Sequence, residues 1–149
     1  MIAAAAGMVI GLTTVTPANA AAARTGFEAM PEKLDKCLDY RADTGPYITK
    51  CNFGDYQAWY WDDGIAYTAL HQKATGLCLT ARNGLLAMKP CLASDAAAFW
   101  RVQQGVDGVS VIKNSVTGTC LARNLSDLVQ LSTCTGGDSQ QWEIVYIDM

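Results

Sequence analysis

The sequence predicts an all-β fold built from three copies of one unit of about 42 residues. First, a cysteine pair followed by a tryptophan occurs three times: Cys37, Cys51 and Trp59; Cys78, Cys91 and Trp100; Cys120, Cys134 and Trp142. Second, the first cysteines of successive copies are 41 and 42 residues apart. Third, short stretches of alternating apolar and polar residues recur between glycine turns, and no helical pattern competes with them.

Each copy is expected to contain about four short strands. Residues 67–71 and 109–113 alternate as strands do and align at an offset of 42. A Thr-Gly turn follows each of them, and glycine suits such a turn because it accepts positive φ. The resulting lobes are residues 37–76, 77–118 and 119–149, which together form the predicted domain, 37–149.

A unit of this size cannot bury a core of its own, so three units are expected to share one around a pseudo-threefold axis. The tryptophans that close the motif, Trp59, Trp100 and Trp142, would occupy equivalent inner positions. A tryptophan side chain buries on the order of 200 Å2, which makes these residues the predicted structural core.

Six cysteines allow 15 disulfide pairings. Equivalent cysteines should have equivalent partners, so the simplest symmetric solution joins Cys37 to Cys51, Cys78 to Cys91, and Cys120 to Cys134. Each bridge closes a short loop and is expected to stabilise the fold by roughly 3 kcal/mol. Zinc is disfavoured because no C-x2-4-C spacing occurs.

The segment before the repeats predicts a secreted protein. Residues 1–20 are largely apolar, too short to span a bilayer, and end in the small-x-small sequence Ala18-Asn19-Ala20, as in a cleaved signal peptide. Residues 21–36 are predicted to form an N-terminal arm outside the domain. Phe27 and Met30 lie among charges in this arm and are the predicted partner-binding residues.

Composition argues against several classes of function. The net charge is −3, and the 11 basic residues are scattered, which disfavours nucleic acid as a partner. No polybasic or amphipathic segment predicts insertion into a membrane. There is one histidine and no triad, acid–base pair or metal-ligand set, so the chain is not predicted to be an enzyme or to need a cofactor.

The pattern resembles the ricin B-type (R-type) β-trefoil lectins. Members of that family carry a Cys-Leu-Asp opening and a Gln-x-Trp motif in each lobe. Here Cys37-Leu38-Asp39, Gln57-Ala58-Trp59 and Gln140-Gln141-Trp142 match, whereas the middle copy has Ala98-Phe99-Trp100. The resemblance implies a β-trefoil with one disulfide in each lobe that binds sugars without catalysis or a cofactor.

The resemblance also implies where a sugar would bind. The family uses the Asp after Cys-Leu, an aromatic residue two before the second cysteine, and an Asn-Gln pair before the tryptophan. The first lobe keeps the Asp and the Gln but has Thr49 at the ring position, so nearby tyrosines would have to supply the ring. The predicted sugar-binding residues are Asp39, Tyr47, Tyr56 and Gln57. Alternatively, Asp39 and Gln57 satisfy backbone groups of turns.

The two remaining lobes lack these side chains. The four positions hold Thr80, Lys89, Ala97 and Ala98 in the second lobe, and Ala122, Ser132, Ser139 and Gln140 in the third. Degenerate pockets favour a protein-binding adaptor, or a subunit of a secreted toxin-type complex, with a secreted protein as its partner. The alternative is a carbohydrate-binding lectin that uses the first lobe only, with a glycan as its partner.

Overall fold

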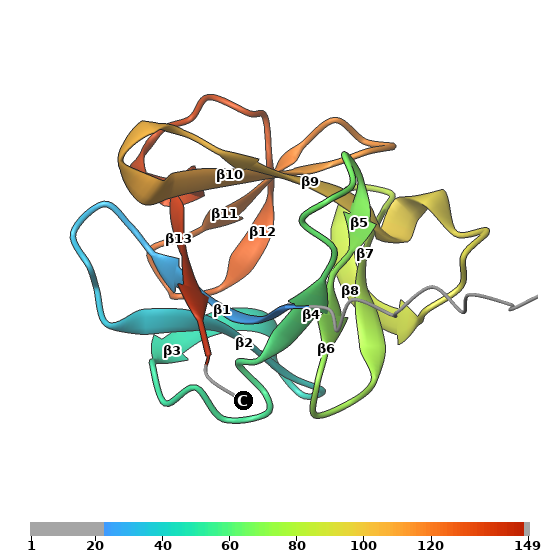
Figure 1. The fold of residues 1–149 in the computed structure, drawn as a ribbon, viewed down its shortest axis with the longest axis horizontal. Helices are drawn as coiled ribbons and strands as arrows, with labels where there is room; N and C mark the ends of the chain where they lie inside the picture. Colours follow the sequence, from blue (N-terminus) through green and yellow to red (C-terminus); the bar gives the residue numbers. More distant parts are fainter. Residues whose placement is uncertain (1–22, 148–149) are drawn as a thin grey trace, which may run out of the picture.

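The computed structural model describes residues 23–147; the predicted signal peptide, residues 1–20, lies outside them. Thirteen strands and three short 3-10 helices fall into three successive lobes, without an α-helix in this part of the chain (Figure 1). The first lobe contains β1 (Ala23–Ala29), β2 (Lys36–Arg41), β3 (Gly45–Lys50) and β4 (Trp59–Trp61). The second contains β5 (Thr68–Ala69), β6 (His71–Gln72), β7 (Leu77–Arg82), β8 (Leu85–Pro90), η1 (Ala96–Ala98) and β9 (Phe99–Gln104). The third contains η2 (Val106–Gly108), β10 (Val109–Asn114), β11 (Cys120–Arg123), β12 (Val129–Ser132), η3 (Asp138–Gln140) and β13 (Trp142–Tyr146).

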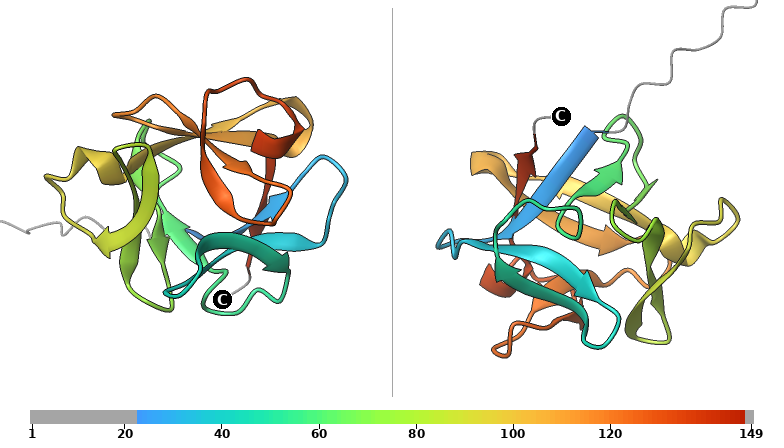
Figure 2. Two further views of the ribbon diagram at one scale, coloured as in Figure 1. Left: turned by 180° about the vertical axis from the view of Figure 1, so that it is seen from behind. Right: turned by 90° about the horizontal axis from the view of Figure 1, so that it is seen from below.

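The outer strands of the lobes close into one antiparallel ring. β1 pairs with β4 and β13, β13 pairs with β10, and β10 pairs with β9. β9 pairs with β5 and β4 pairs with β6, so β5 and β6 act as two halves of one ring strand. The hairpins β2–β3, β7–β8 and β11–β12 contact one another through β3, β8 and β12. Figure 2 shows the three hairpins from two further directions, and the predicted β-trefoil is confirmed.

The core repeats one contact three times. The side chains of Trp59, Trp100 and Trp142 are completely buried. Each indole Nε1 donates to the carbonyl oxygen of the leucine that follows the first cysteine of its lobe: Leu38 at 3.2 Å, Leu79 at 2.8 Å and Leu121 at 3.2 Å. The indole thus fills the centre and satisfies its only donor, as a buried tryptophan must.

The predicted disulfides are confirmed. Cys37 joins Cys51, Cys78 joins Cys91 and Cys120 joins Cys134, with Cα–Cα distances of 5.0, 5.1 and 5.1 Å. Each bridge ties the first strand of a hairpin to the segment that leaves its second strand, and none of the described cysteines is free.

The predicted N-terminal arm is wrong, because residues 23–29 form β1 of the first lobe. β1 pairs with β13 from Thr25 opposite Tyr146 to Ala29 opposite Trp142. Glu28 faces Cys37 just as His71 faces Cys78 and Lys113 faces Cys120. Each lobe therefore begins one strand before its first cysteine, which moves all three predicted boundaries.

The prediction that Phe27 binds a partner is wrong for the same reason. Its ring is 0% exposed and occupies the position of Leu70 and Ile112, which are also fully buried. Met30 is half-buried in the turn after β1, where its backbone N–H donates to the carbonyl of Gln141 at 2.9 Å. None of the helices in residues 23–147 is long and apolar enough to cross a membrane.

Candidate functional site: a pocket in the first lobe

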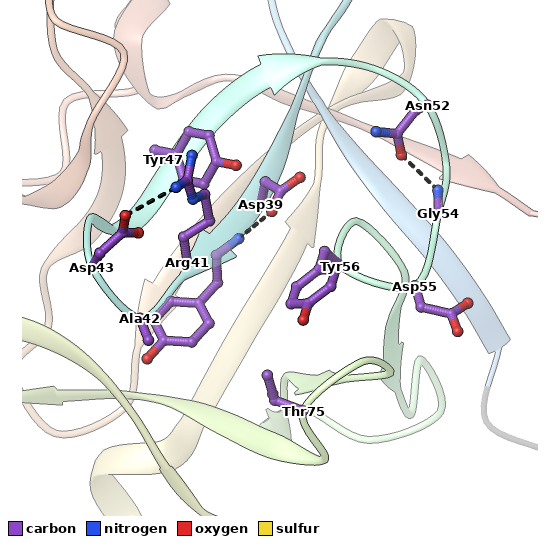
Figure 3. Close-up of a pocket in the computed structure, with 11 residues that line it drawn as sticks. Asp39, Arg41, Ala42, Asp43, Tyr47, Asn52, Gly54, Asp55, Tyr56 and Thr75 are labelled. Carbon is purple, nitrogen blue, oxygen red and sulfur yellow. Dashed lines mark hydrogen bonds and ion pairs between the residues drawn. The ribbon is translucent and has the colours of Figure 1, made fainter.

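A pocket of about 680 Å3 opens beside the β2–β3 hairpin. The hairpin forms one wall, the loop of residues 52–56 forms another, and Thr75 from the next lobe completes the lining (Figure 3). Three of the four predicted sugar-binding residues, Asp39, Tyr47 and Tyr56, meet in this pocket.

Asp39 is the most enclosed acid of the pocket. Its side chain comes from β2 and the residue is 5% exposed. Oδ1 accepts the backbone N–H of Tyr40 at 2.7 Å, and Oδ2 accepts Nε2 of Gln57 at 3.1 Å. Both donors are neutral, and within residues 23–147 no cation forms an ion pair with this carboxylate.

Gln57 does not line the pocket, and its predicted contact with a sugar is wrong. It is 0% exposed. Oε1 accepts the backbone N–H groups of Asn52 at 2.8 Å and Phe53 at 3.1 Å, while Nε2 also donates to the carbonyl of Lys50 at 3.0 Å. Gln57 therefore holds the 52–56 loop and orients Asp39, the alternative role that the sequence left open.

The third lobe repeats this arrangement without a carboxylate. Oε1 of Gln140 accepts the N–H groups of Thr135 at 2.8 Å and Gly136 at 3.2 Å, and its Nε2 donates to the carbonyl of Thr133 at 2.7 Å. Ala122 stands where the first lobe has Asp39. Loop support is therefore the shared task of the two glutamines.

Two tyrosines supply ring surface at the pocket. Tyr47 lies on β3 directly opposite Asp39, and Tyr56 lies in the loop with 54% of its surface exposed. In the view of Figure 3, Asp39 lies between the two rings. Burial raises the pKa of the Tyr47 phenol above its usual 10.0; the negative charge of Asp39 acts in the same direction and Arg41 opposes both.

The pocket rim carries two ion-pair groups. Arg41 Nη2 lies 2.9 Å from Oδ2 of Asp43. Asp55 Oδ1 lies 2.8 Å from Nζ of Lys73 and 3.8 Å from Nη2 of Arg24. The hydrogen bond from Lys73 lowers the pKa of the Asp55 carboxyl.

β1 supports the pocket from behind. Nη2 of Arg24 donates to the carbonyl of Phe53 at 3.4 Å, and a Cβ on Gly26 would come within 3.2 Å of the Phe53 ring. The glycine therefore permits a close approach between β1 and the 52–56 loop. Sequence reasoning missed this support because it placed β1 outside the domain.

The equivalent place in the second lobe is a hollow of about 430 Å3 with a mixed apolar and charged lining. Leu92 and Val116 line it and are 58% and 59% exposed. Thr80, at the position of Asp39, is buried and donates its hydroxyl to the carbonyl of Ala87 at 2.9 Å. Asp95 bonds to Arg82 on the rim, so the charges there are already paired.

The described residues show no metal site beside the pocket, and their histidine has a structural role. They contain no group of three potential metal ligands. His71, the only histidine, bonds through Nε2 to the carbonyl of Gly76 at 2.9 Å and packs beside the Tyr60 ring. Its partners are therefore those of a structural side chain.

Residues 28–143 match the ricin-type beta-trefoil lectin domain. The chain belongs to this family. Ricin-type trefoils are non-catalytic, carbohydrate-binding modules found in lectins and toxins. A comparison with curated protein sequences finds no match.

Solved structures show the same fold. A designed three-fold symmetric protein, ThreeFoil, has a TM-score of 0.71 at 21% identity, over 83% of this chain and 99% of that one. The cytolethal distending toxin from Actinobacillus actinomycetemcomitans has a TM-score of 0.70 at 20% identity, covering 82% and 90%. SeviL bound to asialo-GM1 saccharide has a TM-score of 0.68 at 13% identity, covering 84% and 98%. At these identities the likeness shows the fold alone.

Proposed function

We propose that this protein is a secreted, non-catalytic carbohydrate-binding module that holds one saccharide in the pocket of its first lobe. The observation that carries the proposal is the meeting of Asp39, Tyr47 and Tyr56 at one cavity. A sugar presents directional hydroxyls on its edge and C–H groups on its faces. A carboxylate accepts hydrogen bonds from the former, and aromatic rings pack against the latter.

Asn52 adds a donor to this set. It is exposed and lines the pocket, and its Oδ1 accepts the backbone N–H of Gly54 at 2.8 Å. Within residues 23–147 its Nδ2 bonds to no protein atom, so it is available to a sugar oxygen. Asp39 and Asn52 together provide an acceptor and a donor, which can bind a hydroxyl in both of its roles.

The other lobes support a single site. The second lobe has Thr80 in place of Asp39 and no aromatic ring lines its hollow. The third lobe has Ala122, Ser132 and Ser139 at the corresponding positions. Because lectins gain avidity by linking several sites, a protein with one site is expected to bind weakly unless it is part of a larger assembly.

Binding to a glycan panel, followed by calorimetric titration, tests the proposal. Asp39→Ala and Tyr56→Ala are expected to abolish saturable binding. Tyr67→Ala is the matched control, because Tyr67 is an exposed loop tyrosine, at 45%, that does not line the pocket. Saturable binding that survives Asp39→Ala would exclude the first-lobe pocket as the site.

A second candidate function is protein binding, as an adaptor or a subunit of a secreted toxin-type complex. It is supported by the exposed side chains of Leu92 and Val116, which line the second-lobe hollow where the first lobe has its pocket. The buried Phe27 no longer supports it. Affinity capture from culture fluid is expected to recover a defined partner that is lost with Leu92→Ser and Val116→Ser but retained with Asp39→Ala.

Secretion is part of the proposal and has its own test. Three disulfides are typical of an oxidising compartment. The mature protein in culture fluid is expected to begin at Ala21, which N-terminal sequencing measures. If the protein were recovered only from the cell interior, with its cysteines reduced, secretion would be excluded.

A further inference from the structure

We propose that the first-lobe pocket accepts uncharged glycan ends and rejects those that carry a carboxylate or a sulfate. This inference rests on the proposed function and specifies the class of saccharide. It follows from how the charged groups around the pocket are paired.

The carboxylate inside the pocket forms no ion pair within residues 23–147. Asp39 is bonded to a backbone N–H and an amide, at 2.7 and 3.1 Å, and both donors are neutral. The side chain is almost enclosed, so water screens it poorly. An anionic ligand in the pocket would meet this negative charge at short range in a medium of reduced dielectric constant.

The cations around the pocket are already paired. Arg41, the only cation in the lining, is held by Asp43 at 2.9 Å. Lys73 is bound to Asp55 at 2.8 Å, and Arg24 lies 3.8 Å from the same carboxylate. The lining itself therefore contains three carboxylates and one guanidinium.

A guanidinium is the preferred partner of a carboxylate, so Arg41 is the residue that would otherwise bind an acidic sugar. An acidic ligand would have to compete with Asp43 for this guanidinium, which reduces what the ligand gains from the ion pair. A neutral sugar does not need this ion pair, because it uses the acceptor oxygens of Asp39 and the ring faces. The arrangement of charges in the pocket therefore favours neutral glycan ends over anionic ones.

Four labelled probes test the inference by fluorescence anisotropy. They are lactose, sialyl-lactose, the methyl ester of sialyl-lactose, and sulfated lactose. The ester has nearly the size of the acid but no charge, so it separates electrostatic from steric rejection. We expect the two acidic probes to bind about tenfold more weakly than lactose, and the ester to recover most of the loss.

A pair of variants places the effect at the pocket. Asp43→Asn releases Arg41 and is expected to strengthen binding of the two acidic probes relative to lactose. Asp63→Asn makes the same change in net charge at an exposed turn outside the pocket and is expected to leave the ratio unchanged. Added salt is expected to reduce the difference in affinity between lactose and the acidic probes in the unmodified protein.

The outcomes are distinct. Equal or tighter binding of sialyl-lactose by the unmodified protein overturns the inference and leaves the proposed function standing. A failure of the ester to bind better than the acid shows steric exclusion and also overturns it. Absence of binding by all four probes, and by a wider neutral panel, overturns the proposed function and the inference with it.

Discussion

The first and third lobes contain the same glutamine arrangement but differ in what lies beside it. Gln57 and Gln140 each accept two backbone N–H groups and donate to one carbonyl. Only Gln57 has a carboxylate next to it, because Ala122 replaces the Asp39 of the first lobe. The Gln-x-Trp motif therefore indicates a supported loop and a buried indole, and is not by itself a sign of a sugar site.

The second lobe shows that even the glutamine is replaceable. Ala98 stands in its place, and the loop is instead held by Asp95, whose Oδ1 accepts the N–H of Ala97 at 3.2 Å. Asn114 Nδ2 donates to the carbonyl of the same alanine at 2.9 Å. The Trp100 contact with Leu79 is unchanged. The core contact is therefore the same in all three lobes, although the residues that hold the loop and line the pocket differ.

The largest expected loss of stability comes from substitutions in the core that all three lobes share. Trp100→Ala and Trp142→Ala should each lower the free energy of unfolding by roughly 3–5 kcal/mol, because both remove a fully buried indole. Urea denaturation followed by circular dichroism measures the loss. If one of these variants lost less than about 1 kcal/mol of unfolding free energy, the tryptophans would not contribute equally to stability despite their equivalent positions.

The next largest expected effect on stability comes from removing a disulfide that lies away from the pocket. Replacing Cys78 and Cys91 by alanine should lower the free energy of unfolding by roughly 2–4 kcal/mol. Because this bridge lies in the second lobe, ligand binding by the folded double variant should be unchanged. Loss of binding with the fold intact would mean that the second lobe contributes to the site.

The glutamines provide the sharpest test of the comparison between lobes. Gln57→Ala and Gln140→Ala each strand buried backbone groups and should cost roughly 1–3 kcal/mol of stability. Only Gln57→Ala should weaken saccharide binding, because only Gln57 orients a carboxylate. Thermal melting and titration of both variants measure the two effects. Equal affinities would show that Asp39 does not need this support.

The smallest effect concerns the titration of Tyr47. Its pKa is raised in the folded state, chiefly by burial, so the folded protein holds this proton more tightly than the unfolded chain. The resulting stability is complete below the unfolded value near 10 and is lost as the pH rises through the folded value. Tyr47→Phe should reduce the fall in melting temperature above pH 10, which thermal melting across that pH range measures.

The spacing of residues was enough to predict what depends on repetition. Each cysteine pair closes a loop of similar length, and each tryptophan follows at a similar distance, so local geometry dictated equivalent partners. β1 escaped this reasoning because residues 23–29 match the later ring strands at few positions, such as Phe27 with Leu70 and Ile112. Strand pairing uses backbone groups and one apolar face, so it tolerates almost any sequence on the other face.

The amino-acid sequence alone determined the triplicated unit, the local disulfides, the three central tryptophans and the lobe that retains an acid. The tertiary structure decided that Gln57 supports Asp39 from behind, that Tyr47 and Tyr56 face the same cavity, and that Arg41 and Asp43 pair at its rim. The reason is physical. Spacing along the chain encodes contacts between neighbours, whereas burial and charge pairing depend on which distant segments the closed ring brings together.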